Sequence, residues 1–127
     1  MSIQSILERK GAKVFTIEPT ATVRTAAQLM QMHGIAALVV KSADVIGGLI
    51  SEREIVHAIS QHGERALSMA VLDVMTRSTI TVAPGDTLKR AMTLMTNHRV
   101  RHLIVIGKLG MANSSAAIVL SRGQNHI

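Results

Sequence analysis

The chain of 127 residues contains no cysteine, tryptophan or tyrosine, and it has a single phenylalanine. Without cysteine, the protein cannot form disulfides, thiolate metal sites or a cysteine nucleophile. The scarcity of aromatic side chains argues against a protein that stacks the bases of single-stranded nucleic acid. The core must therefore be aliphatic, and we interpret those of the eight methionines that stand at helical spacing as core residues.

Long apolar runs are also missing from the sequence. Stretches such as Leu103–Ile106 are far shorter than a membrane span. The N-terminal sequence MSIQSILERKG lacks the basic region and the long apolar stretch of a signal peptide. We therefore expect a cytoplasmic protein that does not enter a membrane, and the length predicts one compact domain with a real core.

Acidic residues are scarce in the second half of the chain. Residues 1–76 have equal numbers of basic and acidic side chains, whereas residues 77–127 have seven lysines and arginines and a single acid, Asp86. The net charge of +6 therefore comes from the second half. This excess is either an ordinary solvated basic face or a surface that attracts an anion, from a small phosphate to nucleic acid.

An internal repeat dominates the sequence. Residues 15–40, FTIEPTATVRTAAQLMQMHGIAALVV, align without a gap on residues 80–105, ITVAPGDTLKRAMTLMTNHRVRHLIV, at an offset of 65 residues. The matches include Pro19 with Pro84, Thr22 with Thr87, Leu29-Met30 with Leu94-Met95, and His33 with His98. So many matches in one register indicate a tandem duplication.

Each copy has the same predicted order of elements. In the first copy, residues 14–17 are β-rich, and Thr22 caps a helix with apolar residues at helical spacing. Strands follow over 36–40 and 45–50, and a helix runs from about 52 to 61. Each copy therefore reads β-α-β-β-α, and the two copies together predict an α/β fold.

The repeat also divides the chain. We expect repeat 1 to span residues 1–62, including an N-terminal lead-in helix that Gly11 ends. Residues 63–76 form a linker and the lead-in helix of repeat 2, which covers about residues 70–75. Repeat 2 then spans residues 77–127.

Repeat 2 is atypical after about residue 110. Aligning Gly110 with Gly47 places Ser114 at the position of Ser51. The expected strand is then lost, and the remaining sequence, interrupted by Gly123, is too short for a full last helix. We interpret this tail as truncated or altered by a changed reading frame.

The residues that carry the duplication resemble a known family. VMT, TVAPGDTL and HRVRHLIV in the second copy, and GIAALVV and GGLISEREIV in the first, resemble the cystathionine β-synthase (CBS) domain, a regulatory module that occurs in tandem pairs. The resemblance covers residues 3 to about 111. It implies two β-α-β-β-α repeats packed into one pseudo-two-fold module, which commonly forms a homodimer. It further implies sensing rather than catalysis, through an adenosine-containing ligand (AMP, ADP, ATP, NAD or S-adenosylmethionine) bound in the cleft between the repeats.

The resemblance also indicates the ligand-binding residues. In the family, the short first strand offers backbone groups and apolar side chains to the base, and the start of the next strand adds contacts. A Ser/Thr-x-x-Asp motif opens the last helix, where hydroxyl and N–H groups face phosphate and Asp accepts from ribose. The corresponding residues here are Thr16, Ile17, Ile35, Ala36, Ala37, Ser51, Arg53 and Glu54 in repeat 1, and Thr81, Val82, Val100, Arg101, His102 and Ser114 in repeat 2.

The chain departs from the family at the carboxylate. Glu54 stands where the family has Asp, and it either reaches ribose or forms a capping box with Ser51. In repeat 2, the same alignment puts Ala117 at this position, so the ribose carboxylate is missing. Arg101 and His102 are the anion candidates there, against the alternatives of a surface charge and a partly buried strand residue.

Other functions are less well supported by the sequence. An enzyme is not expected, because only Ser51, Glu52 and Glu54 cluster locally and helix capping explains them; neither a GxGxxG nor a Walker motif is present. No metal or other cofactor is expected. The alternatives are a ligand-free dimerisation module and, less favoured, a basic nucleic-acid-binding protein. The expected partners are the nucleotide, a second copy of the chain and a separate protein target.

Overall fold

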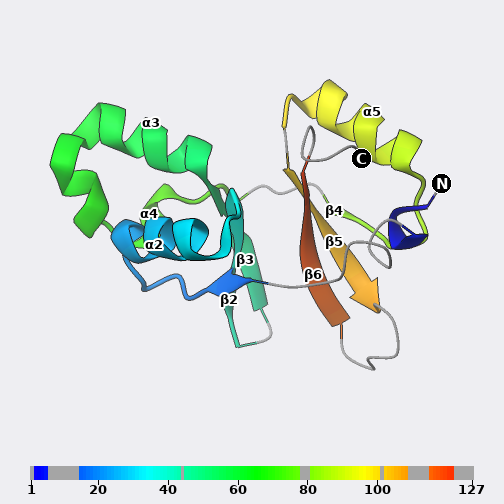
Figure 1. Ribbon diagram of the computed structural model, residues 1–127, viewed down its shortest axis with the longest axis horizontal. Coiled ribbons are helices and arrows are strands. Elements are labelled where there is room, and N and C mark those ends of the chain that lie inside the picture. Colours follow the sequence, from blue (N-terminus) through cyan, green and yellow to red (C-terminus); the bar gives the residue numbers. More distant parts are fainter. Residues whose placement is uncertain are drawn as a thin grey trace. The chain divides into compact units, whose positions relative to one another are not determined.

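Figure 1 shows the computed structural model, which describes residues 2–5, 15–43, 45–77, 81–100, 102–108 and 115–121. The chain forms two compact units: one is Phe15–Thr79, and the other combines Met1–Val14 with Ile80–Ile127. Each unit contains a sheet with helices, which confirms the predicted α/β class. No helix in the described ranges is long and apolar enough to span a membrane.

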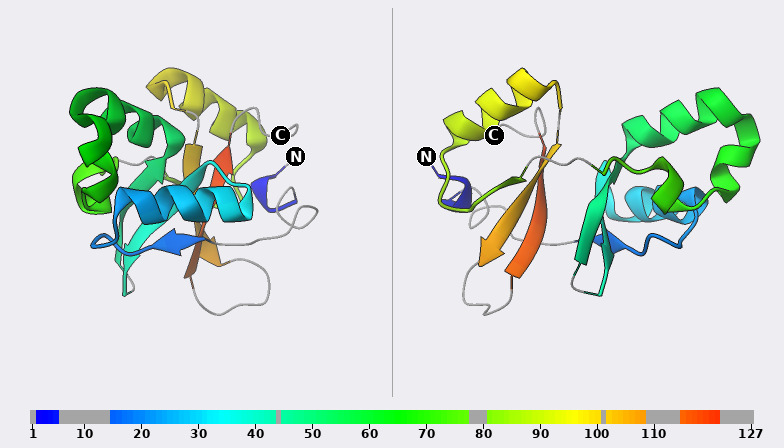
Figure 2. Two further views of the ribbon diagram at one scale, coloured as in Figure 1. Left: turned by 60° about the vertical axis from the view of Figure 1, so that its left-hand side comes forward. Right: turned by 180° about the vertical axis from the view of Figure 1, so that it is seen from behind.

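The repeat 1 unit is built on a three-stranded sheet in the order β1-β2-β3. In chain order its elements are β1 (Thr16–Ile17), α2 (Val23–His33), β2 (Ala37–Ser42), β3 (Val45–Ser51), α3 (Glu52–His62), the 3-10 helix η1 (Gly63–Ser68) and α4 (Val71–Val74). β1 and β2 are parallel, whereas β2 and β3 form an antiparallel hairpin. α2 and α3 lie on one face of this sheet (Figure 2).

The repeat 2 unit has the same strand order and directions. Its elements are β4 (Thr81–Val82), α5 (Leu88–His98), β5 (His102–Lys108) and β6 (Ser115–Ser121). Thr81 pairs with Ile104, as Thr16 pairs with Val39, so both partners differ by the predicted offset of 65 residues. The strand pairs of the two sheets therefore repeat at the offset that the sequence duplication predicts.

Each unit has an aliphatic core, as the composition predicts. The buried cluster of repeat 1 contains Ile17, Val23, Ala26, Met30, Leu38, Val40, Ile50, Ile55 and Val71. The cluster of repeat 2 contains Ile3, Val82, Ala91, Met95, Leu103 and Val105. Met30 and Met95 occupy equivalent positions and are both buried, which agrees with their interpretation as core residues.

Threonines cap the equivalent helices α2 and α5, as predicted. Thr22 Oγ1 accepts the N–H of Thr25 at 3.2 Å, and Thr87 Oγ1 accepts the N–H of Arg90 at 3.1 Å. Each bond satisfies one of the backbone donors that a helix leaves open in its first turn.

Removing either cap should therefore weaken the protein. We expect Thr22→Ala and Thr87→Ala each to lower the free energy of unfolding by about 1 kcal/mol. Urea titration followed by circular dichroism measures this change. Thr20→Ala, at an exposed turn residue, is the control, and an equal loss in the control would contradict the capping role.

The N-terminal lead-in segment packs on repeat 2. The N–H of Ile3 donates to the carbonyl of Asp86 at 3.0 Å, and the N–H of Gln4 donates to that of Pro84 at 2.8 Å. The Ile3 side chain is fully buried in the core of repeat 2. The prediction that residues 1–62 form one repeat with its own lead-in is therefore corrected: residues 2–5 close repeat 2.

The second lead-in segment makes the reciprocal contacts on repeat 1. The N–H of Val71 donates to the carbonyl of Ala21 at 2.8 Å, and the N–H of Leu72 donates to that of Pro19 at 3.0 Å. Ala21 and Pro19 lie 65 residues before the acceptors used in repeat 2. Residues 2–5, which come before repeat 1, complete the core of repeat 2, and α4, which comes before repeat 2, completes the core of repeat 1. The two lead-in segments are thus exchanged between the repeats.

The linker after α4 pairs with the outer edge of β3. Leu49 and Thr76 exchange backbone hydrogen bonds of 3.0 and 2.9 Å. Gly48 lies where this segment approaches most closely, because a Cβ atom there would overlap the carbonyl oxygen of Thr76. A residue without a side chain therefore allows the linker to cover the sheet edge.

β6 corrects the alignment expected for the end of repeat 2. Ala37 pairs with Ser51 across β2 and β3, and the equivalent His102 pairs with Ser121 across β5 and β6. Ser121 therefore stands at the register position predicted for Ser114, which itself lies outside the described residues. The prediction aligned Gly110 with Gly47 and so assumed a shortened turn in repeat 2, whereas the β5–β6 connection is longer than the β2–β3 connection. The strand that seemed lost from the tail is present.

Candidate ligand-binding site

Strand pairing brings together several of the ligand residues predicted in repeat 1. Ala37 pairs with Ser51, and the N–H of Glu52 donates to the carbonyl of Ala36 at 3.0 Å. The start of β2 and the first turn of α3 therefore lie side by side. This adjacency follows from the hairpin register, which ends β3 opposite the first residue of β2.

The first strand of each repeat offers less than predicted. Thr16 and Thr81 are exposed, but Ile17 and Val82 are 6% and 5% exposed and belong to the two cores. Period-two alternation sends one side chain of each short strand outward and the next inward. The side chains of Ile17 and Val82 thus belong to the two cores.

The residues before β2 and β5 are equivalent and also support the cores. The N–H of Ile35 donates to the carbonyl of Met30, and that of Val100 to Met95, both at 3.0 Å. Ile35 and Val100 are half-buried and pack against their own clusters. Each residue follows the left-handed cap of the preceding helix, Gly34 or Arg99. Packing on the cores therefore explains the apolar side chains of Ile35 and Val100.

Ser51 and Glu54 are bonded to each other at the start of α3. The N–H of Ser51 donates to Glu54 Oε1 at 2.7 Å, and the Ser51 hydroxyl donates to the same oxygen at 2.8 Å. Ser51 is the single buried polar residue among those whose exposure the structure describes. Of the two roles predicted for Glu54, the structure shows the capping box.

The first turn of α3 is negatively charged around this bond. Glu52 and Glu54 both lie in the turn, with the exposed Arg53 between them. The positive end of the helix favours these carboxylates. The carboxylate of Glu54 therefore already lies at the N-terminus of α3, which Ser51 caps.

In repeat 2, the predicted residues are only partly described. His102 is half-buried at the start of β5, opposite Ser121. Arg101 and Ser114 lie outside the described residues. The sequence analysis did not identify Ser121. The apolar run AAIVL precedes Ser121 as the strand VIGGLI precedes Ser51, and this run was the signal that could have identified it.

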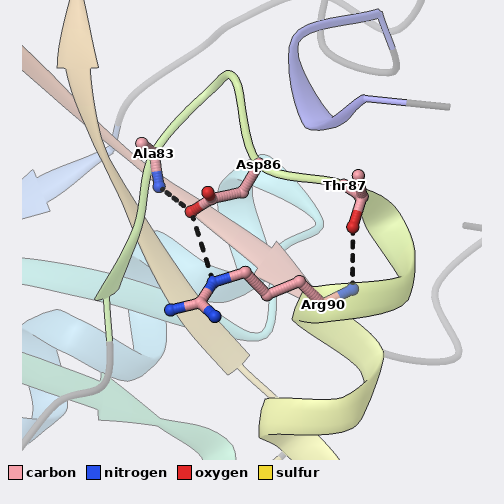
Figure 3. Close-up of polar contacts among 4 residues, drawn as sticks. All are labelled: Ala83, Asp86, Thr87 and Arg90. Atoms are coloured by element: carbon pink, nitrogen blue, oxygen red, sulfur yellow. Dashed lines mark hydrogen bonds and ion pairs between the residues drawn. The ribbon is translucent and has the colours of Figure 1, made fainter.

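Asp86, the single acidic residue of the second half, accepts a hydrogen bond within its own turn. Asp86 Oδ2 accepts the N–H of Ala83 at 2.8 Å and lies 3.9 Å from Nε of Arg90, as Figure 3 shows. Because the Arg90 side chain is 62% exposed, solvent screens this pair. The other basic residues of the second half have no further acid in that half to balance them.

No group of three or more histidine, aspartate or glutamate side chains in the described ranges is arranged to hold a metal ion. The site in repeat 1 instead combines an exposed strand residue, a strand start and a carboxylate on a helix. Such a set suits hydrogen bonding to a polar organic ligand.

Comparisons with known proteins give this arrangement a family. The family model described as CBS domain matches residues 6–61 and 71–111. The mitochondrial CBS domain-containing protein CBSX3 of Arabidopsis thaliana is 39% identical over 95 residues, which are 71% of this chain and 46% of that protein. The chain thus matches less than half of that relative's length.

Solved structures of CBS-domain proteins also resemble this chain. The CBS-domain containing protein ATU1752 from Agrobacterium tumefaciens is 30% identical with a TM-score of 0.84, over 94% of this chain and 87% of that one. The CBS domain protein PAE2072 from Pyrobaculum aerophilum, complexed with AMP, is 25% identical with a TM-score of 0.79, over 95% and 87%. The chain therefore belongs to the CBS domain family and carries two copies of the domain in tandem.

Proposed function

We propose that this protein is a regulatory module that binds an adenosine-containing nucleotide through its CBS repeats. The observation that carries the proposal is the AMP complex of the Pyrobaculum aerophilum protein, with which this chain shares its fold over 95% of its length. The adjacency of Ala36, Ala37 and the first turn of α3 supports it, because these are positions at which the family binds its ligand.

The residues of repeat 1 have distinct roles in this proposal. The exposed Thr16 and the backbone of Ile17 border the base, and the start of β2 completes that border. Glu54 accepts hydrogen bonds from ribose hydroxyls through the capacity that Ser51 leaves open, because a carboxylate has about four acceptor sites. Arg53 and the basic residues of repeat 2, with Arg101 and His102 as candidates, attract the phosphate groups.

Binding would act on a separate protein. A ligand that binds one arrangement of the repeats more tightly than another shifts the population toward it. We infer that an unidentified target, or a second copy of this chain in a homodimer, responds to that shift. The protein performs no catalysis in this proposal.

A ligand-free dimerisation module is the second candidate. Val56 and Ile59 lie one turn apart on α3 and are 65% and 42% exposed. Exposed apolar side chains at this spacing form the kind of stripe that a partner helix covers. The closed Ser51–Glu54 pair also needs no ligand to satisfy it.

Thermal unfolding distinguishes the two candidates. We expect one of AMP, ATP, NAD or S-adenosylmethionine at millimolar concentration to stabilise the protein, by about 2.7 kcal/mol at 100 times its dissociation constant. Circular dichroism is a suitable probe because tryptophan is absent.

Glu54→Ala should abolish the ligand-induced shift, because it removes the ribose acceptor. Glu52→Ala is the matched control, since it removes an acid from the same turn without breaking the bonds to Ser51. Each shift is compared with the melting temperature of the same variant without ligand. An unchanged melting temperature with all four ligands would favour the dimerisation module.

A further inference from the structure

We propose that Met75 is an oxidation-sensitive site, at which a peroxide converts the thioether to a sulfoxide and so releases the linker from the edge of β3. Met75 is not among the proposed nucleotide-binding residues, and its oxidation does not require nucleotide binding. Because the sequence has no cysteine, its eight methionines carry all of its sulfur atoms. Oxidation of methionine to the sulfoxide is reversible, because reductases restore the thioether.

Met75 lies beside the hydrogen bonds that hold the linker. It follows α4 directly and precedes Thr76, whose backbone exchanges two hydrogen bonds with Leu49. Its sulfur lies 3.2 Å from the point at which a Cβ atom of Gly48 would stand, and its Cε lies 3.6 Å from the corresponding point at Gly47. The thioether therefore packs against the two glycines of β3, next to the paired backbone segment.

Met75 is accessible to solvent and also packed. It is half-buried and contacts the core cluster of repeat 1. Met30 and Met95 are 5% and 0% exposed, so a peroxide in solution reaches them poorly. Met32 is 72% exposed, so an oxygen atom added to its sulfur would remain in water. Of these four side chains, Met75 alone combines access for a peroxide with a packed sulfur.

The chemical step needs hydrogen peroxide as its co-reactant. A lone pair of the sulfur attacks one peroxide oxygen, the O–O bond breaks, and an S–O bond forms. The second oxygen leaves as hydroxide and takes the proton of the transferred oxygen, so that one water molecule is released. The sulfur loses two electrons and the peroxide gains them. The product carries a polar acceptor oxygen on a side chain that was apolar.

The sulfoxide does not fit the place that the thioether occupies. An added atom overpacks the contact with β3, and a buried acceptor without a donor is unfavourable. The N–H groups of Leu49 and Thr76 already donate to each other's carbonyl oxygens, so neither can serve the new oxygen while the linker is paired. The oxidised side chain therefore turns toward solvent, and the linker leaves the edge of β3 with it.

Hydrogen exchange at two amides of the full chain tests the proposal. The N–H groups of Leu49 and Thr76 bond across the pair, so their exchange rates, measured by NMR, report its opening. Hydrogen peroxide should oxidise Met75, as followed by mass spectrometry of peptides, and accelerate exchange at both amides by about tenfold. Methionine sulfoxide reductases should restore slow exchange.

Matched variants assign the response to one sulfur atom. Met75→Leu keeps an apolar side chain of similar volume, so peroxide should leave the exchange of the two amides unchanged. Met32→Leu, Met69→Leu and Met92→Leu each remove another exposed or half-buried methionine and should keep the response of the parent. Met75→Gln places a polar group at the site and should accelerate both amides without peroxide. Circular dichroism confirms that each variant is folded.

Several outcomes would contradict this role of Met75. Unchanged exchange at both amides after complete oxidation of Met75 would overturn it, as would an equal response in Met75→Leu. Oxidation of the buried Met30 and Met95 before Met75 would show that the peroxide acts on unfolded protein instead. Should Met75→Leu not fold, the parent still decides, because an acceleration that follows the oxidation of Met32 in time, rather than that of Met75, counts against the proposal.

Discussion

Replacing Gly48 with alanine should lower the free energy of unfolding by about 3 kcal/mol. The added methyl group would overlap the carbonyl oxygen of Thr76 and lie 3.2 Å from Sδ of Met75. The sulfur can move with its side chain, but the oxygen belongs to the backbone segment that pairs with Leu49. The linker must therefore leave the edge of β3, and the two hydrogen bonds between Leu49 and Thr76 are lost.

The neighbouring glycine provides a matched control for this substitution. A methyl group at Gly47 would meet Met75 Cε at 3.6 Å and the carbonyl oxygen of Val40 at 3.8 Å, which are ordinary contacts. Gly47→Ala should therefore change the free energy by no more than about 0.5 kcal/mol. Urea unfolding followed by circular dichroism compares the two variants. Equal losses would show that close approach of the linker is not what requires glycine.

Ile3→Ala should destabilise repeat 2, although Ile3 precedes repeat 1 in the chain. The Ile3 side chain is fully buried against a cluster that includes Val82, Met95 and Leu103. Truncation of a buried isoleucine leaves a cavity and costs about 2–4 kcal/mol. Amide hydrogen exchange should accelerate in β4 and β5 and remain slow in β1 to β3, because each core is a separate cluster.

Leu72→Ala is the control for this experiment. Leu72 lies in the other lead-in segment and is 38% exposed, so its truncation should cost less than about 1 kcal/mol. Faster exchange in β1 to β3 of the Ile3→Ala protein, with β4 and β5 unaffected, would instead place this segment on repeat 1. That result would contradict the exchange of lead-in segments.

The sequence predicted those features that local patterns determine. A threonine before an apolar periodic run identified the starts of α2 and α5, because the capping oxygen and the helix face are encoded within a few residues. The 65-residue offset identified equivalent strands, since duplicated sequences place equivalent residues at equivalent registers. The parallel pairs Thr16–Val39 and Thr81–Ile104 follow this offset.

Features that depend on partners distant in the chain were not predictable in this way. The apolar turn around Ile3 signals a buried helix but carries no signal for which repeat buries it. Ser121 was missed because register depends on hairpin length, and a longer connection shifts every later residue of β6.

The role of Glu54 shows a different limit. Spacing alone permits both a capping box and a bond to ribose, and only the geometry around Ser51 shows which one forms in this structure. The sequence therefore proposed the residues of the candidate site, but the bonds that Glu54 makes required atomic distances.

The exchanged lead-in segments also constrain the order in which the protein can fold as it is synthesised. Phe15–Thr79 is continuous in sequence and contains its own closing segment, so this unit can fold once that stretch has left the ribosome. Ser2–Ser5 lie earlier in the chain, but the residues that bury Ile3 belong to repeat 2. Ser2–Ser5 can dock only after repeat 2 has been synthesised, and their docking costs the entropy of closing a long loop. Repeat 1 can therefore fold before translation is complete, whereas repeat 2 is completed only when an earlier segment of the chain returns to it.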